Sequence, residues 1–160
     1  MKTRPLLALT LALLIGSTWA AVVRPAPEIA LQLGAKTVPL RSFHGQAVVA
    51  LFAESPSSRT FRSQVKELET MYDHFAASKV VFVAAFKDGS TDPVRSNIPF
   101  VVSSSGTAAC TAYDLKGKFA IAIVGADGNL DYVTEQTLHA NRVREVLQNS
   151  FTVQQSARQR

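Results

Sequence analysis

The sequence predicts an α/β fold: a mixed sheet of about four core strands plus an N-terminal β-hairpin, flanked by helices. Two patterns carry this prediction. Residues 47–53 and 80–86 are almost wholly apolar and enclose a helical pattern, which is the order of a β-α-β unit with parallel strands covered on both faces. Residues 118–134 form two strand-like runs about Asp127-Gly128, which predicts an antiparallel hairpin.

One long helix is expected between the two apolar strands, ending near Ser78. Ser57 or Ser58 is placed to cap its first turn. Apolar side chains then recur mostly every three or four residues, as they do on the buried face of a helix. They are Phe61, Val65, Leu68, Met71, Tyr72 and Phe75.

The remaining elements are shorter. Residues 28–33 and 36–40 flank a glycine turn and predict the N-terminal hairpin. Residues 94–105 show no regular pattern, and a short helix is expected over 107–113. Helical spacing of apolar residues returns over 138–147, where the last helix is predicted.

The first twenty residues have the features of a cleavable signal peptide. Lys2 and Arg4 precede the apolar run 6–15, and Thr18 and Ala20 supply small residues for cleavage near Ala20. This apolar run is too short for a spanning helix, which needs about 20 residues. We therefore expect a periplasmic or secreted protein, with an uncleaved anchor as the alternative.

The rest of the chain has the length of one domain. Residues 21–27 are expected to be an extended lead-in, because prolines punctuate them. The domain itself is placed at 28–151, and residues 152–160 are expected to form a polar, frayed tail.

The charge balance excludes some classes of partner. Cleavage would remove two of the 17 basic residues, which leaves 15 against 12 acidic residues and a net charge of +3. These charges are interspersed, apart from Arg158 and Arg160 at the tail. We expect no binding to nucleic acid, nor to a membrane after signal cleavage. The three histidines are too dispersed for a metal site, so neither a metal nor another cofactor is expected.

Cys110 is the only cysteine, so the chain cannot form an internal disulfide. Two interpretations stay open for it. Free cysteine is among the most buried residue types, which favours a small apolar core residue. The alternative is a reactive thiol that senses redox state or forms an intermolecular disulfide.

The order of these segments is similar to that of known proteins. Residues 26–40 and the strand 48–52 supply a proline, a short hairpin, a glycine and an apolar strand. They resemble the start of peroxiredoxins and of exported thiol-disulfide oxidoreductases. Residues 99–115 and the hairpin 119–130 are similar to later segments of the same proteins. The resemblance covers about residues 26–150 and implies a thioredoxin-like fold.

The hairpin Gly117-Lys118-Phe119-Ala120 to Gly125-Ala126-Asp127-Gly128 also looks like a second group of proteins. These are short exported bacterial proteins that are thioredoxin-like, lack the cysteine pair and have no assigned function. We identify this cysteine-less branch as the closer relative.

The resemblance fails at the reactive turn. Oxidoreductases have Cys-Pro-x-Cys-Arg after the first core strand, and peroxiredoxins have Thr-x-x-Cys, where this chain has Ser55-Pro56-Ser57-Ser58-Arg59. Both chemistries need a thiolate, which a serine does not provide. The expected cis-proline is absent before the strand at 119, and Lys118 stands where peroxiredoxins would place an arginine. Thiol chemistry is therefore not expected at Ser55 or Ser58.

We therefore expect a non-catalytic binding or accessory module, with a protein or small ligand as its partner. Its expected surface is the vestigial active-site edge, which we define as Ser55, Pro56, Ser58, Arg59 and Lys118.

Adjoining residues of that surface are Arg62 and the loop 98–100. No catalytic residue is assigned. One alternative is a redox enzyme or sensor that relies on Cys110. A weaker one is a hydrolase with Ser58 as nucleophile and His139 as its base.

Overall fold

The computed structural model describes residues 24–158, and the side chains of residues 24–150. The predicted signal peptide lies outside the described residues. The elements are β1 (Ala30–Leu33), β2 (Lys36–Pro39), the 3-10 helix η1 (Leu40–Phe43), β3 (Val48–Ala53), α1 (Arg59–Glu69), α2 (Tyr72–Ala77), β4 (Val81–Phe86), β5 (Phe100–Ser103), α3 (Gly106–Ala112), β6 (Phe119–Val124), β7 (Leu130–Thr134) and α4 (Ala140–Arg158).

The strands form one mixed sheet in the order β2-β1-β5-β4-β3-β6-β7. Strand β3 pairs in parallel with β4 and antiparallel with β6. The predicted β-α-β unit and closing hairpin are therefore both confirmed, and they meet at β3. The N-terminal hairpin is also confirmed, and β1 joins it to the sheet by antiparallel pairing with β5.

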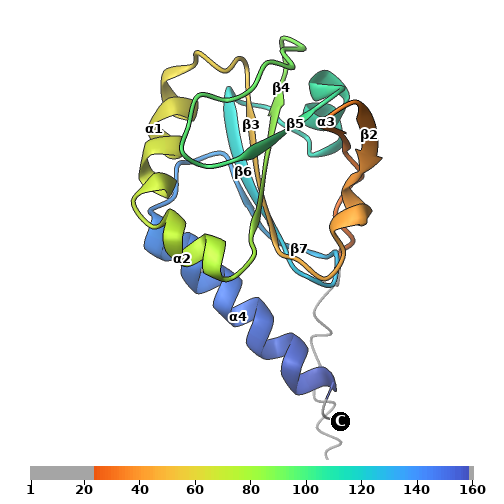
Figure 1. Ribbon diagram of the computed structural model, residues 1–160, viewed down its shortest axis with the longest axis vertical. Helices are drawn as coiled ribbons and strands as arrows, with labels where there is room; N and C mark the ends of the chain where they lie inside the picture. Colours follow the sequence, from red (N-terminus) through yellow and green to blue (C-terminus); the bar gives the residue numbers. More distant parts are fainter. Residues whose placement is uncertain (1–23, 159–160) are drawn as a thin grey trace, which may run out of the picture.

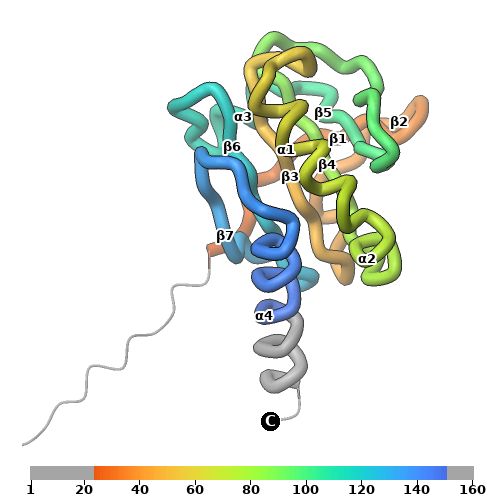
Figure 2. The backbone as a smooth tube through the Cα atoms, turned by 90° about the vertical axis from the view of Figure 1, so that its left-hand side faces the viewer, coloured from red at the N-terminus to blue at the C-terminus, as the bar shows by residue number. Residues whose placement is uncertain are grey.

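Two hydrophobic cores lie on opposite faces of this sheet. Alternate residues of β3 point to each side: Val49 and Leu51 to one core, Ala50 and Phe52 to the other. The first core packs against α1, α2 and α4, and the second packs against α3. Figure 1 shows this division, and Figure 2 shows α1, α2 and α4 together on the face toward the viewer.

The prediction of a single long helix between β3 and β4 is wrong, because this segment forms two helices with a break at Thr70 and Met71. The Thr70 hydroxyl donates a hydrogen bond to the Glu67 carbonyl at 2.6 Å, and Met71 leaves helical geometry at φ −127°. The apolar pattern continues through the break because α1 and α2 cover the same core. Periodicity alone therefore does not reveal it.

Two other expectations need correction. Residues 94–105, predicted to be irregular, contain β5, which lies between β4 and β1. Its four residues are too few to show a strand period. The last helix does not end near residue 147, because α4 continues to Arg158 and includes residues 152–158, which were expected to be frayed. The tail's Gln, Ala and Arg residues are good helix formers even without an apolar stripe.

No helix among residues 24–158 is both long and apolar enough to cross a bilayer.

Helix α1 holds the start of α4 through two polar side chains. Gln64 is fully buried; its amide donates to the Leu138 carbonyl at 2.8 Å and accepts from the Leu138 N–H at 2.7 Å. Glu67 accepts a hydrogen bond from the Ala140 N–H at 3.0 Å. That N–H is one of the unpaired donors at the first turn of α4, so Glu67 acts as a cap supplied by another helix.

The contact with Ala140 lowers the pKa of Glu67 below its ordinary value of about 4.5, against an opposing effect of partial burial and with a further lowering from His139. A lowered pKa in the folded state means that the carboxylate stabilises the protein above pH 4.5. This stabilisation is lost as the pH falls through the folded pKa.

We therefore expect Glu67→Gln to lower the free energy of unfolding at pH 7 by at most about 1 kcal/mol, because the side chain is 39% exposed. The difference from wild type should shrink as the pH falls from about 5 toward 3. Urea unfolding followed by circular dichroism at each pH measures it. Glu145→Gln, on the outer face of α4, is the control. A difference that is constant between pH 7 and pH 3 would contradict this account.

Candidate functional site

In the turn after β3, the hydroxyls of the three serines form hydrogen bonds within the turn or to the first turn of α1. The Ser58 hydroxyl accepts a hydrogen bond from the Phe61 N–H at 3.4 Å and caps α1, as predicted for a serine here. The hydroxyls of Ser55 and Ser57 lie 3.0 Å apart and bond to each other. The Ser58 N–H donates to the Ser55 carbonyl at 3.1 Å, which closes the turn. These contacts fix the turn at the end of the central strand.

Backbone hydrogen bonds bring two other loops to this turn. The Glu54 N–H donates to the Lys118 carbonyl at 3.2 Å, and the Asp88 N–H donates to the Glu54 carbonyl at 3.0 Å. The structure thus places Lys118 beside the turn, as the resemblance implied. The loop before β6 is held by Glu135, whose carboxylate accepts from the N–H groups of Lys116 and Gly117, both at 3.0 Å.

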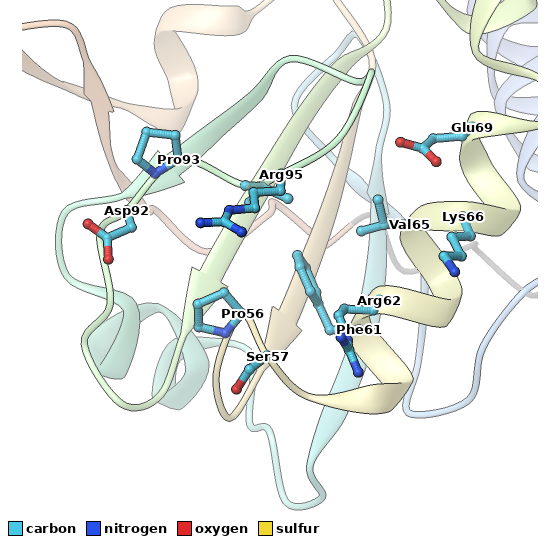
Figure 3. A pocket seen from close by; sticks show the side chains of 11 residues that line it. Pro56, Ser57, Phe61, Arg62, Val65, Lys66, Glu69, Asp92, Pro93 and Arg95 are labelled. Carbon is cyan, nitrogen blue, oxygen red and sulfur yellow. The ribbon is translucent and has the colours of Figure 1, made fainter.

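A groove of about 630 Å³ lies next to this turn, between α1 and the loop 92–95 (Figure 3). Its volume is in the range of sites that bind small ligands. Of the vestigial active-site edge, only Pro56 lines it. We call it the α1 groove and define it by its lining residues: Pro56, Ser57, Phe61, Arg62, Val65, Lys66, Glu69, Asp92, Pro93, Val94 and Arg95.

The charges around the α1 groove are mostly uncommitted cations. Arg62 and Arg95 are exposed, and within the described residues neither has a carboxylate within 4 Å. Glu69 is already used: it accepts from the Ser96 hydroxyl at 2.7 Å and the Asn97 N–H at 2.9 Å. The Asn97 N–H and the Ser96 hydroxyl lower the pKa of Glu69, against an opposing effect of partial burial.

Cys110 lies on the other face of the sheet from α1 and its groove. It is 2% exposed in the core beneath α3, on the sheet face opposite α1, and its thiol is 3.9 Å from the Ala85 carbonyl. Burial raises the pKa of the Cys110 thiol, against a weaker opposing effect of the Lys87 charge. Reactive cysteines instead have a lowered pKa and an exposed sulfur.

The close packing of α3 explains this burial. Gly106 begins the helix, and a Cβ there would lie 2.2 Å from the Phe86 carbonyl oxygen. Only glycine therefore lets α3 approach the end of β4 so closely, and this approach encloses Cys110.

Ser58 and His139 are not brought together. The His139 ring nitrogen Nδ1 lies 3.4 Å from the Glu67 carboxylate. Glu67 is nine residues beyond Ser58, the N-cap of α1, which is about 13.5 Å at the helical rise of 1.5 Å per residue. Since the Ser58 hydroxyl also caps α1, the pair does not form the hydrogen-bonded nucleophile and base that a hydrolase needs.

Sequence reasoning missed the second wall of the α1 groove, which contains Asp92 and Arg95. It also did not single out Lys66. The position of the loop depends on β5, which lay in the stretch predicted to be irregular. The apolar run Phe100-Val101-Val102 could have indicated this strand, since it is β-branched and follows a proline.

The fold can be compared with known proteins. No protein-family profile and no curated protein sequence matches the chain. Solved structures do match it. The thioredoxin domain of a thiol-disulfide oxidoreductase from Bacteroides vulgatus is 18% identical with a TM-score of 0.62, over 80% of this chain and 99% of that one. A thiol:disulfide interchange protein of the thioredoxin family from Chlorobium tepidum is 15% identical with a TM-score of 0.61, over 82% and 98%.

A third match is the bacterioferritin comigratory protein of Xanthomonas campestris, studied for its alkyl peroxide reduction activity. It is 18% identical with a TM-score of 0.57, over 81% of this chain and 95% of that one. At these identities the likeness concerns the backbone arrangement and not the chemistry of any site. The chain has a thioredoxin-like fold.

Proposed function

We propose that this protein is an exported, thioredoxin-like binding module without thiol redox activity, and that it binds its partner at the end of the sheet where β3 stops. One observation carries the proposal. The only cysteine of the chain is 2% exposed, in the core between α3 and the sheet face opposite α1. Serines occupy the turn that precedes α1.

The chemical reason is the need for an accessible thiolate. Disulfide exchange proceeds by attack of a thiolate on a sulfur atom, so both the pKa and the exposure of the thiol set the rate. A thiol at the N-terminus of α1 would gain from the positive end of the helix dipole. Ser55 and Ser58 have no thiol there, and the Cys110 thiol has a raised pKa in the core.

The remaining features of this end support binding. The turn, Lys118 and the loop after β4 are fixed by backbone hydrogen bonds. Arg59, Arg62 and Arg95 are exposed, and among the described side chains no carboxylate lies within 4 Å of them. A rigid surface with uncommitted charges favours specific binding, because little ordering is needed when a partner arrives.

Export is part of the proposal. The charged start, the short apolar run and the small residues before Ala21 support a cleaved signal peptide, and periplasmic delivery follows from it in a bacterium. A single cysteine is also compatible with an oxidising compartment, since it leaves no second thiol in the chain with which to form a wrong internal pair.

The alternative, a redox enzyme or sensor that relies on Cys110, predicts a different result in a direct assay. We expect wild type and Cys110→Ser to reduce hydrogen peroxide, and a disulfide that links two chains of a substrate protein, no faster than a blank without the protein. Robust wild-type activity that Cys110→Ser abolishes would overturn the proposed function.

The alignment of the turn can be tested by restoring its thiols. We expect Ser55→Cys/Ser58→Cys, made in the Cys110→Ser background, to form an internal disulfide and to gain disulfide-reducing activity at least about tenfold above wild type, because the helix N-terminus lowers the pKa of the new thiol. Ser55→Cys/Ser104→Cys is the matched control, with its second thiol placed after β5. Two unpaired thiols in the first variant would contradict the alignment.

A further inference from the structure

We propose that the α1 groove binds an acidic, extended peptide segment of a partner protein, whose carboxylates contact Arg62 and Arg95 while neighbouring apolar side chains lie on Pro56, Pro93 and Val94. This inference rests on the proposed function and specifies the partner. It also places the site on the β5 side of α1, away from Lys118 and the rest of the vestigial active-site edge.

The two arginines approach the groove from opposite walls. Arg62 comes from α1 and Arg95 from the loop before β5, and Figure 3 shows Phe61 between the two side chains. Guanidinium groups prefer carboxylates, which they can bind through two parallel N–H donors. Neither group has a carboxylate within 4 Å among the described residues, so both are available to a ligand.

Two acidic residues, Glu69 and Asp92, also line the groove, and they are fewer than its three cations. Glu69 accepts from Ser96 and Asn97, and Lys66 lies close enough to contribute to the lowering of its pKa. Asp92 lies at the far rim in Figure 3, on the outer side of the loop. The lining as a whole therefore carries a net charge of +1, from three cations, Arg62, Lys66 and Arg95, against the two carboxylates.

Both walls are held in place before any ligand binds. Phe61 is 1% exposed and packs edge-on against Phe86, with ring centroids 5.0 Å apart, which fixes the first turn of α1. On the other wall, the hydrogen bonds to Glu69 and the burial of Ile98 anchor the loop to α1. A preformed groove loses little conformational entropy on binding.

The lining favours a peptide over a free small anion. Pro56, Pro93 and Val94 supply partly exposed apolar surface between and beside the cations. Exposed ion pairs are individually weak because water screens them, so two such pairs alone hold a small anion poorly. A segment with alternating acidic and apolar side chains adds contacts along the groove with Pro56, Pro93 and Val94.

The test is a selection with a phage-displayed library of random peptides, carried out on the wild-type protein and on two double variants. Arg62→Gln/Arg95→Gln removes the two proposed contacts. Arg41→Gln/Arg142→Gln removes the same charge from η1 and α4, outside the groove, where both arginines form exposed ion pairs.

We expect wild type and the control variant to select peptides rich in Asp or Glu beside apolar residues. By fluorescence anisotropy, a selected peptide should bind the groove variant at least about tenfold more weakly and the control within about twofold. Its Asn/Gln analogue should also bind wild type at least about tenfold more weakly.

Several results would overturn the proposal. They are no selected peptide, no acidic enrichment, equal weakening by both double variants, or competition by inorganic phosphate or succinate as effective as by the peptide. The last would mean a small-anion site. These results do not depend on Cys110, so failure of this inference and failure of the proposed function are distinguishable.

Discussion

The structure depends on the double pairing of β3. This strand is hydrogen-bonded to β4 on one side and to β6 on the other along all six of its residues, and every one of them is buried. A strand so enclosed cannot slip in register, because a shift of one residue would exchange its two core faces. The end of β3 is therefore fixed, and so are the turn that leaves it and the loops on either side.

The same constraint explains which parts of the fold could be predicted. Strands covered on both faces and a tight Asp-Gly hairpin leave strong sequence patterns, so β3, β4, β6 and β7 were predicted within a residue or two. Strand β5 was missed because four residues do not show a period. The break at Thr70 was missed because it depends on a side-chain bond to Glu67, while the apolar stripe continues across it.

Part of the candidate site could likewise be predicted from the sequence, and part could not. Local chemistry predicted Ser58 as a helix cap, and the resemblance to peroxiredoxins implied Lys118 near the same turn. The α1 groove is a tertiary feature. Arg62 and Arg95 are 33 positions apart, and the groove that both line depends on β5, the bonds to Glu69 and the burial of Ile98. An evolved thioredoxin-like scaffold can thus lack a thiol at the turn and still present a rigid, charged surface beside it.

The central claim is that no accessible thiol exists, and the reactivity of Cys110 in the native protein tests it most directly. The measurement is the rate of reaction with an aromatic disulfide reagent at neutral pH, in buffer and in denaturing urea. Because the thiol is enclosed by α3 and the sheet, the native rate should be at least about a hundredfold below the unfolded rate. A native rate equal to the unfolded one would contradict the account.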